Sequence, residues 1–221
     1  MSGWTTHVGT LVQLAMDGVD TDQLIPARFM SRPRADGYGD CLLHDLRRDA
    51  HGERLADFPL ERHPDASILL AGHDFGCGSS REAAVYALVD AGIRVIIAPG
   101  FGDIFAANAI NNGLLPARID EGARSTLQGI VGDDSATMRV SLEDSTLSIA
   151  GTSLPFALDD SWRTRLVNGW DDIDLTLAHA SRIARHRDLR RREARWAWPA
   201  DTAASPQTTN AAGVRIPTRR D

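Results

Sequence analysis

The segment GHDFGCGSSREAA, residues 72–84, gathers residue types that are suited to binding an anion. Gly76 and Gly78 carry no Cβ, so the backbone there is able to approach a ligand closely. Arg81 offers a planar fork that matches a carboxylate, and the first amides of a following helix add partial positive charge. The spacing therefore predicts an anion-binding turn at the start of a helix.

Ser79 and Glu82 stand at the first and fourth positions of a capping box, which predicts that Ser79 caps the helix and Glu82 bonds back to the cap. Such boxes are common, so this pattern alone fits a purely structural turn. If Ser79 acts as a base, the helix terminus contributes only about 0.3–1 kcal/mol, at most about 2 kcal/mol, which moves the pKa by little more than about one unit. A serine base therefore needs Arg81 and further cations, some of them from outside this chain.

The composition excludes several kinds of catalysis. All 24 basic residues are arginines, and the absence of lysine excludes Schiff-base catalysis, a pyridoxal-phosphate lysine and a Walker-type phosphate loop. Cys41 and Cys77 cannot supply the four thiolates of an iron–sulfur cluster, and neither has metal-ligand spacing, so we expect no metal on this chain. Cys77 precedes a helix N-terminus, where a thiol can have a low pKa, but no histidine partner is close in sequence, so Cys77 is interpreted as a small packed residue.

Charge and hydropathy also limit the partners. The net charge of -6 gives no general attraction to nucleic acid or to an anionic membrane. No apolar run reaches the roughly 18 residues of a spanning helix. The first residues, MSGWTTHVGT, lack the basic and apolar regions of a signal peptide. We therefore expect a cytoplasmic protein with no membrane partner.

The elements around the turn predict a mixed α/β fold. Apolar runs alternate with helical patterns, which favours parallel strand–helix–strand units, and residues 136–151 alternate around a turn as an antiparallel hairpin does. The expected strands are 7–14, 67–72, 93–99 and 114–119, and the expected helices include 79–92, 102–113 and 120–132.

The organisation along the chain is predicted as one domain followed by a tail. Residues 1–198 form the domain, and 174–198 are expected to be one long helix rich in arginine. Residues 31–66 are polar with little periodicity, which suggests a functional loop or a lid. Residues 199–221 have the composition of a disordered tail.

Five segments occur in an order and spacing that resemble the small subunits of 3-isopropylmalate dehydratase, the swivelling domain of the aconitase superfamily. They are VDTDQLIPARFM, DFGCGSSRE, VIIAPGFGDIF, NNGLLPARI and LVNGWDDIDLTL, and the resemblance covers about residues 5–185. It implies a swivelling β/β/α fold and a chain that is half of a hydro-lyase. A separate large subunit would carry the [4Fe–4S] cluster as Lewis acid.

The reaction implied by the resemblance isomerises 2-isopropylmalate to 3-isopropylmalate by dehydration and rehydration, in leucine biosynthesis. The resemblance places Ser79 as the catalytic base and Arg81 at a carboxylate of this dicarboxylic hydroxy acid, with Ser80 as a further substrate-binding residue. Asp22 and Arg28 fall in the family's other active-site turn. Without the resemblance, this second turn is more simply an Asx-turn with a surface arginine.

The chain departs from the family pattern at two places. Ala83 replaces a histidine, and Val85-Tyr86 replace a common Pro/Val-Trp pair. In the substrate-specificity loop around residues 33–38, Ala35 stands where the family has arginine, although Arg34 is adjacent. These changes leave open a paralogue that acts on another 2-substituted malate.

Two functions of a different kind remain as alternatives. One is an inactive anion-binding module. The other is a nucleic-acid-binding protein that uses the arginines of residues 182–196, although Asp188 and Glu193 interrupt that run and arginine is favourable at a helix C-terminus in any case. Nucleic acid is therefore not the partner we expect.

Overall fold

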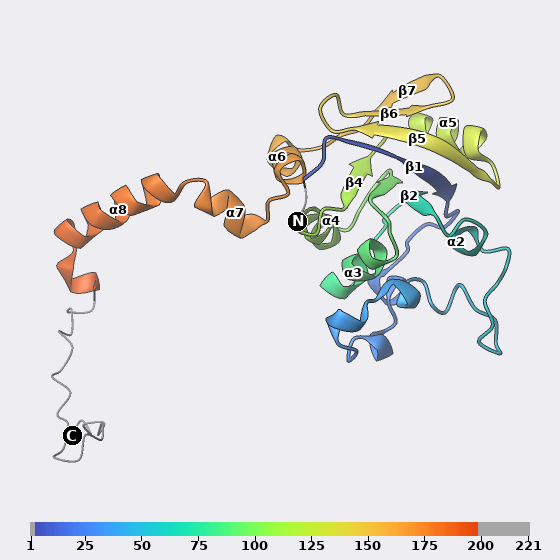
Figure 1. Ribbon diagram of the computed structural model, residues 1–221, viewed down its shortest axis with the longest axis horizontal. Coiled ribbons are helices and arrows are strands. Elements are labelled where there is room, and N and C mark those ends of the chain that lie inside the picture. Colours follow the sequence, from blue (N-terminus) through green and yellow to red (C-terminus); the bar gives the residue numbers. More distant parts are fainter. Residues whose placement is uncertain (1–2, 199–221) are drawn as a thin grey trace, which may run out of the picture. The chain divides into compact units, whose positions relative to one another are not determined.

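The computed structural model describes residues 3–198 and divides the chain into two compact units, Met1–Leu175 and Thr176–Asp221 (Figure 1). The first unit is built on a seven-stranded sheet in the order β4-β3-β2-β1-β5-β6-β7. The tail predicted at 199–221 lies outside the described residues. The expected mixed α/β class is confirmed.

The sheet has a parallel half and an antiparallel half that meet at β1. β1 to β4 pair in parallel, as the strand–helix–strand pattern predicted, and β5 pairs antiparallel with β1. The predicted hairpin is β5 and β6, and β7 continues it, a strand that the sequence analysis did not identify. The strands are β1 Thr6–Gln13, β2 Ala66–Leu70, β3 Val95–Ala98, β4 Leu115–Arg118, β5 Ser135–Ser141, β6 Thr146–Ile149 and β7 Thr152–Pro155.

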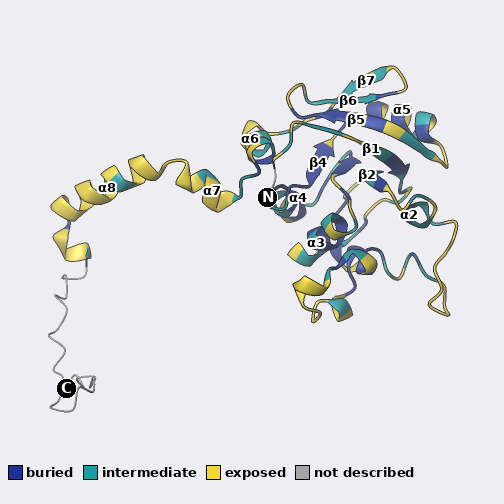
Figure 2. Ribbon diagram, viewed as in Figure 1, coloured by how far each residue is buried: buried dark blue, intermediate teal, exposed yellow. Residues whose placement is uncertain are grey.

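β3 is apolar and buried throughout, and β2 is apolar except for Ser67, because both faces of this part of the sheet are covered. Successive side chains of a strand point to opposite faces. Leu11 and Ile97 accordingly belong to one buried cluster, whereas Val12 and Ile96 belong to the other. Figure 2 shows this buried sheet within the exposed loops and helices around it.

Helices from the connections between strands complete the two clusters. α3 and much of α4 pack in the cluster of Val12, and α5 packs in the cluster of Leu11. α5 begins as expected for an Asp N-cap, because the Asp120 carboxylate accepts from the amide of Ala123 at 2.7 Å. The helices of this unit are α1 Thr21–Leu24, α2 Pro59–Arg62, α3 Glu82–Asp90, α4 Asp103–Asn111, α5 Glu121–Val131 and α6 Asp160–Asn168.

The capping box predicted at Ser79 and Glu82 is wrong. α3 begins three residues later, with an extended Arg81 as N-cap and no side-chain cap. The backbone at Ser79 is not helical, because its carbonyl accepts from the Arg81 amide only two residues further on, at 2.8 Å. The same carbonyl accepts from the hydroxyl of Thr21 at 3.0 Å, which ties this residue to another turn. A capping box does form at α1, between Asp20 and Gln23.

The predicted loop at 31–66 has little regular structure but is well anchored. It contains the short 3₁₀ turns Arg34–Asp36 and Gly39–Cys41, as well as α2. Its buried side chains Tyr38, Leu42 and Leu43 join the cluster under α3, which holds this part of the segment on the domain.

The predicted single helix at 174–198 is divided. α7 spans Asp172–Leu177, α8 spans Ala180–Glu193 and a 3₁₀ turn spans Arg195–Ala197. His179 leaves helical geometry with φ -101° and ψ 16° and serves as N-cap of α8. No residue of α8 is buried.

The fold predicts a pH dependence of stability through His7 on β1. Burial lowers the pKa of His7, and the nearby charge of Arg94 lowers it further. The folded chain therefore resists protonation, whereas the unfolded chain takes up a proton near pH 6.5, so the free energy of unfolding falls as pH drops below about 6.5. Urea titrations between about pH 5 and 7 should show a smaller fall for His7→Gln, while the exposed control His51→Gln should keep the wild-type fall. Equal falls in all three proteins would contradict this assignment.

Candidate active site

The predicted site residues come from turns that follow adjacent parallel strands. The turn after β1 contains Asp22, and the turn after β2 contains residues 72–81. The carboxyl ends of parallel strands share one edge of a sheet, which is the usual place for ligands in α/β folds. Backbone hydrogen bonds join these two turns: Gly18 N to His73 O at 2.8 Å, Gly76 N to Val19 O at 2.7 Å and Thr21 N to Cys77 O at 3.0 Å.

This pairing places Arg81 against Asp22. Nη1 of Arg81 donates to Oδ1 of Asp22, and the two residues are 59 positions apart in sequence. A guanidinium has five N–H donors, so the fork keeps donors for a second carboxylate while Asp22 holds one side of it. The two predicted motifs are thereby brought together.

Ser79 and Ser80 lie at the surface beside this ion pair. Both are exposed, while the Ser79 carbonyl accepts from Thr21 Oγ1 at 3.0 Å and from the Arg81 amide at 2.8 Å. Thr21 is itself buried. The position of Ser79 is therefore fixed from the protein side, while the residue stays accessible from solvent.

The glycines of the turn have different roles. Gly76 has φ +73°, and a Cβ there would lie 2.2 Å from Cγ of Phe105. Packing against α4 therefore explains Gly76, and the expectation that it admits a ligand is wrong because Phe105 fills the space. Gly78 has φ +94° and is exposed, so its backbone remains approachable.

Arg28 lies in a separate ion pair. Its Nη1 donates to Oδ2 of Asp45 at 2.8 Å, and Nδ1 of His44 lies 3.0 Å from the other oxygen of the same carboxylate. The hydrogen bonds from Arg28 and then His44 hold the pKa of Asp45 well below its usual range. Asp45 thus neutralises Arg28, and the structure shows no contact between Arg28 and Arg81.

The predicted specificity loop is tied to α3 through Arg34. Nη1 of Arg34 lies 2.5 Å from Oδ2 of Asp90, and its guanidinium carbon lies 4.0 Å from the ring centroid of Tyr86. The same Asp90 oxygen accepts from the amide of Tyr38 at 2.8 Å. Ala35 is exposed beside these contacts. Tyr86, which departs from the family pattern, therefore has a defined role in holding the loop.

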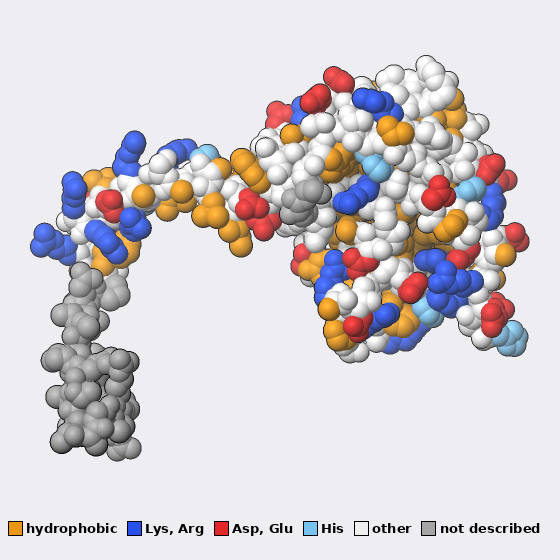
Figure 3. Space-filling view, in the orientation of Figure 1, with side chains coloured by type: hydrophobic (Ala, Val, Ile, Leu, Met, Phe, Trp, Pro, Cys, Tyr) orange, Lys and Arg blue, Asp and Glu red, His pale blue; other side chains and the backbone are white. Residues whose placement is uncertain are grey.

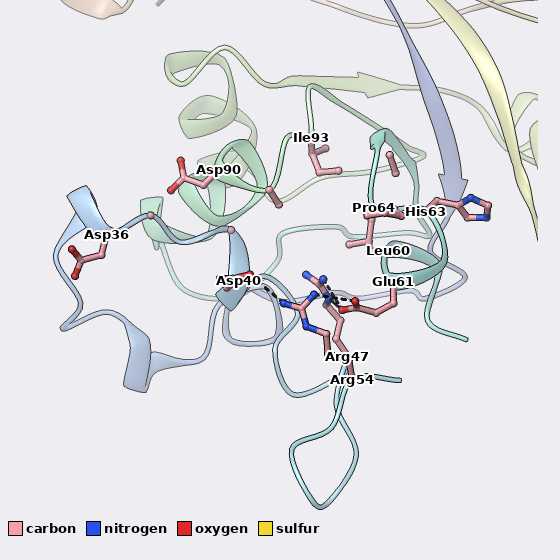
Figure 4. A pocket seen from close by; sticks show the side chains of 14 residues that line it. Asp36, Asp40, Arg47, Arg54, Leu60, Glu61, His63, Pro64, Asp90 and Ile93 are labelled. Atoms are coloured by element: carbon pink, nitrogen blue, oxygen red, sulfur yellow. Dashed lines mark hydrogen bonds and ion pairs between the residues drawn. The ribbon is translucent and has the colours of Figure 1, made fainter. Parts of the chain in front are cut away.

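A cavity of about 360 Å³ lies elsewhere, between the 36–66 segment and the end of α3 (Figure 4). Arg47 and Arg54 converge on Glu61 there, at 2.6 Å and 3.1 Å. Burial raises the pKa of Glu61, but the two arginines outweigh it and lower the pKa below its ordinary value. This cavity contains none of the predicted catalytic or substrate-binding residues. Four of its charged side chains form ion pairs with one another: Asp40, Arg47, Arg54 and Glu61.

Two residues near the site were not identified as such from the sequence. Nδ2 of Asn112, in the NNGLLPARI motif, donates to Oε1 of Glu82 at 3.0 Å, so Glu82 bonds to another element and not to its own helix cap. Asp74 has φ +54° in the turn before Gly76. The motif was a signal for Asn112, whereas nothing in the sequence marked Asp74.

The described residues include no group of three or more His, Cys, Asp or Glu side chains arranged to hold a metal ion. Both cysteines are free, with Cys41 buried and Cys77 partly buried. Within residues 3–198, no helix combines the length and the apolar character that a membrane span requires.

Curated relatives match most of this chain, and a family model matches its first 122 residues. A protein named 3-isopropylmalate dehydratase small subunit from Shewanella baltica is 44% identical over 192 residues, which are 84% of this chain and 96% of the relative. The chain belongs to the 3-isopropylmalate dehydratase small-subunit family. Proteins of the same name from Shewanella amazonensis and Halalkalibacterium halodurans are 45% and 43% identical. The family model of the aconitase C-terminal domain matches residues 1–122.

A solved structure has the same fold as this chain. The crystal structure of 3-isopropylmalate dehydratase from Methanocaldococcus jannaschii aligns with a TM-score of 0.60 at 23% identity, over 82% of this chain and 99% of that one. The resemblance inferred from the sequence motifs is confirmed.

The packing at Gly76 predicts a large cost for a side chain there. Gly76→Ala would combine positive φ with a clash against Phe105, so we expect about 2–4 kcal/mol of lost stability. Gly132→Ala is the matched control, because Gly132 also has positive φ but a Cβ there meets no atom within 4 Å. Thermal unfolding should show a much larger fall in Tm for Gly76→Ala, and equal falls would show that packing against Phe105 is unimportant.

Proposed function

We propose that this chain is the small subunit of a 3-isopropylmalate dehydratase, a hydro-lyase of leucine biosynthesis that isomerises 2-isopropylmalate to 3-isopropylmalate. Identities of 42–45% to relatives of that name over most of the chain support this. The observation that carries it is the ion pair of Arg81 and Asp22 beside the exposed Ser79. That arrangement provides a carboxylate-binding fork next to a group able to exchange a proton.

Arg81 would bind a carboxylate of the substrate. Charge-assisted, bidentate contacts between arginine and carboxylate are strong and directional, so they fix the substrate as well as hold it. Asp22 keeps the guanidinium oriented toward the site. Bound in this way, the carboxylate withdraws electron density from the neighbouring carbon and eases removal of its proton. Ser80 is proposed as a second polar contact to the substrate.

Ser79 would accept that proton and return it in the rehydration step. Its backbone is fixed through Thr21, so its place relative to Arg81 is set before substrate binds. The N-terminus of α3 and Arg81 favour a negative charge there, but their combined effect falls short of a full serine pKa shift. We infer that the partner subunit supplies further cations and closes the exposed site against water.

The partner is proposed to be the large aconitase-like subunit. It would carry the [4Fe–4S] cluster, because the two free cysteines of this chain are too few to hold one. The cluster would supply Lewis-acid activation of the substrate hydroxyl. We place the complex in the cytoplasm.

The main alternative is a substrate that carries a side group other than isopropyl. Ala35 leaves the loop without the family's arginine, and Arg34 is engaged by Asp90 and Tyr86. A complex that acts on another 2-substituted malate would use the same Ser79 and Arg81 chemistry with a differently shaped loop.

Variants of the two turns test the assignment. The large subunit encoded nearest to this chain is co-expressed with it, the complex is purified anaerobically, and alkene formation is followed with 2-isopropylmalate and a panel of 2-substituted malates. Ser79→Ala should lower kcat about 10²–10⁴-fold, as expected for loss of a general base. Arg81→Ala should mainly raise KM through lost carboxylate binding.

Arg28→Ala is the internal comparison. Because Asp45 neutralises Arg28, its loss should raise KM much less than the loss of Arg81. A cluster-loaded complex in which Ser79→Ala retains wild-type turnover would contradict the catalytic role. Turnover of another malate alone would identify the paralogue, and no turnover at all would favour an inactive anion-binding module.

A further inference from the structure

A second cavity lies at the end of β4, on the same edge of the sheet as the candidate active site. Its volume is about 340 Å³, and all of its lining residues belong to the first unit. Phe101 follows β3 and Arg118 ends β4, so the cavity stands where the carboxyl ends of these parallel strands meet. This edge is the usual place for ligands in α/β folds. Neither Ser79 nor Arg81 lines the cavity, which makes it a separate site.

The walls of this cavity are mostly apolar and are built from the core. Phe101 and Ala106 are buried, and the ring of Trp162 is partly buried. A cavity of this size with aromatic and aliphatic walls suits a small organic ligand. The apolar residues that line it come from β4, α4, the start of α6 and the adjoining loops: Phe101, Ala106, Pro116, Ala157, Leu158 and Trp162.

Arg118 brings a positive charge to this cavity that no carboxylate neutralises. Figure 3 shows acidic and basic side chains intermixed over the visible face of the first unit, where arginines such as Arg34 and Arg81 have carboxylate partners. Arg118 is different, because its exposed side chain has no hydrogen bond or ion pair with any of residues 3–198. A free guanidinium beside apolar walls is suited to a carboxylate that carries an apolar group.

Asp159 supplies the opposite charge close to Arg118. The Arg118 carbonyl accepts from the amide of Ala157 at 2.8 Å, which places Asp159 beside the end of β4. Oδ1 of Asp159 accepts from the hydroxyl of Ser161 at 2.6 Å and from its amide at 2.8 Å. These hydrogen bonds lower the pKa of Asp159, so the carboxylate is ionised at neutral pH. A carboxylate has about four acceptor positions, so Asp159 keeps capacity for a further donor.

We propose that this cavity binds a free α-amino acid with a large apolar side chain. Arg118 would bind its carboxylate, Asp159 its ammonium group, and the apolar walls its side chain. One positive and one negative group match a zwitterion, whereas a dicarboxylate would place a second negative charge against Asp159. The expected ligand therefore differs from a substituted malate, and its binding does not depend on the proposed function.

NMR titrations of the full-length chain test the site, with L-leucine and L-phenylalanine as probes. Two analogues of L-leucine each lack one charged group: 4-methylpentanoate has no ammonium group, and 3-methylbutylamine has no carboxylate. We expect a Kd below about 1 mM for both amino acids and at least about tenfold weaker binding of either analogue, because each analogue loses a charge-assisted contact. Glycine, which has no side chain to bury, should bind more weakly than either probe.

Three variants assign the contacts. Arg118→Gln should weaken binding of L-leucine about tenfold and leave that of 3-methylbutylamine unchanged, because only the carboxylate contact is lost. Asp159→Asn preserves a good N-cap for α6, and it should weaken binding of L-leucine but strengthen that of 4-methylpentanoate. The matched control is Arg139→Gln, which removes an exposed arginine of β5 outside this cavity and should keep the wild-type Kd.

The opposite outcomes overturn the proposal. No shift of any signal with about 10 mM of either amino acid would reject the site. Equal affinity for L-leucine and 4-methylpentanoate would reject a zwitterion in favour of a simple carboxylate. Binding that Arg81→Ala abolishes and Arg118→Gln spares would place the ligand in the candidate active site, and equal losses in Arg118→Gln and Arg139→Gln would indicate general charge attraction. Turnover of the complex is a separate measurement, so its failure and the failure of this site are distinguishable.

Discussion

The backbone pairing between the turns after β1 and β2 is the constraint on which the candidate site depends. It brings the amide of Thr21 to the carbonyl of Cys77 and the amide of Gly76 to the carbonyl of Val19. This pairing can form only because β1 and β2 are parallel neighbours, which release both turns at the same edge of the sheet. The Arg81–Asp22 ion pair and the anchored position of Ser79 follow from it.

The same constraint explains why the site turn is so rich in small residues. The 72–81 turn is held between the β1 turn and α4, where Phe105 occupies the space a side chain at Gly76 would need. It also explains why α3 starts late: Ser79 is committed to Thr21, so the helix begins only after Arg81 has turned the chain. At its other end α3 holds the 31–38 loop through Tyr86 and Asp90. One short helix thus joins the turn of the candidate active site to the loop of the proposed specificity site.

The arginines differ in which carboxylates neutralise them, and therefore in whether they are free to bind a ligand. Arg28 and Arg34 are each engaged by a carboxylate away from the Ser79 turn, whereas Arg81 is engaged by a carboxylate within it. The arginines of α8 are exposed in a unit of opposite charge to the first. The structure thus separates arginines that are neutralised within the first unit from those of α8.

The sequence by itself determined the strand–helix order, the motifs and hence the family, because apolar runs and short motifs depend on residues close together in the chain. It did not identify β7, the late start of α3 or the division of the arginine-rich helix. At these places, single hydrogen bonds or local backbone angles decide where an element begins and ends. Only the tertiary structure decided which arginine forms an ion pair with which carboxylate. Arg81 pairs with a residue 59 positions away and Arg34 with one 56 positions away. Such pairs depend on distances between packed elements, which no local pattern of residues encodes.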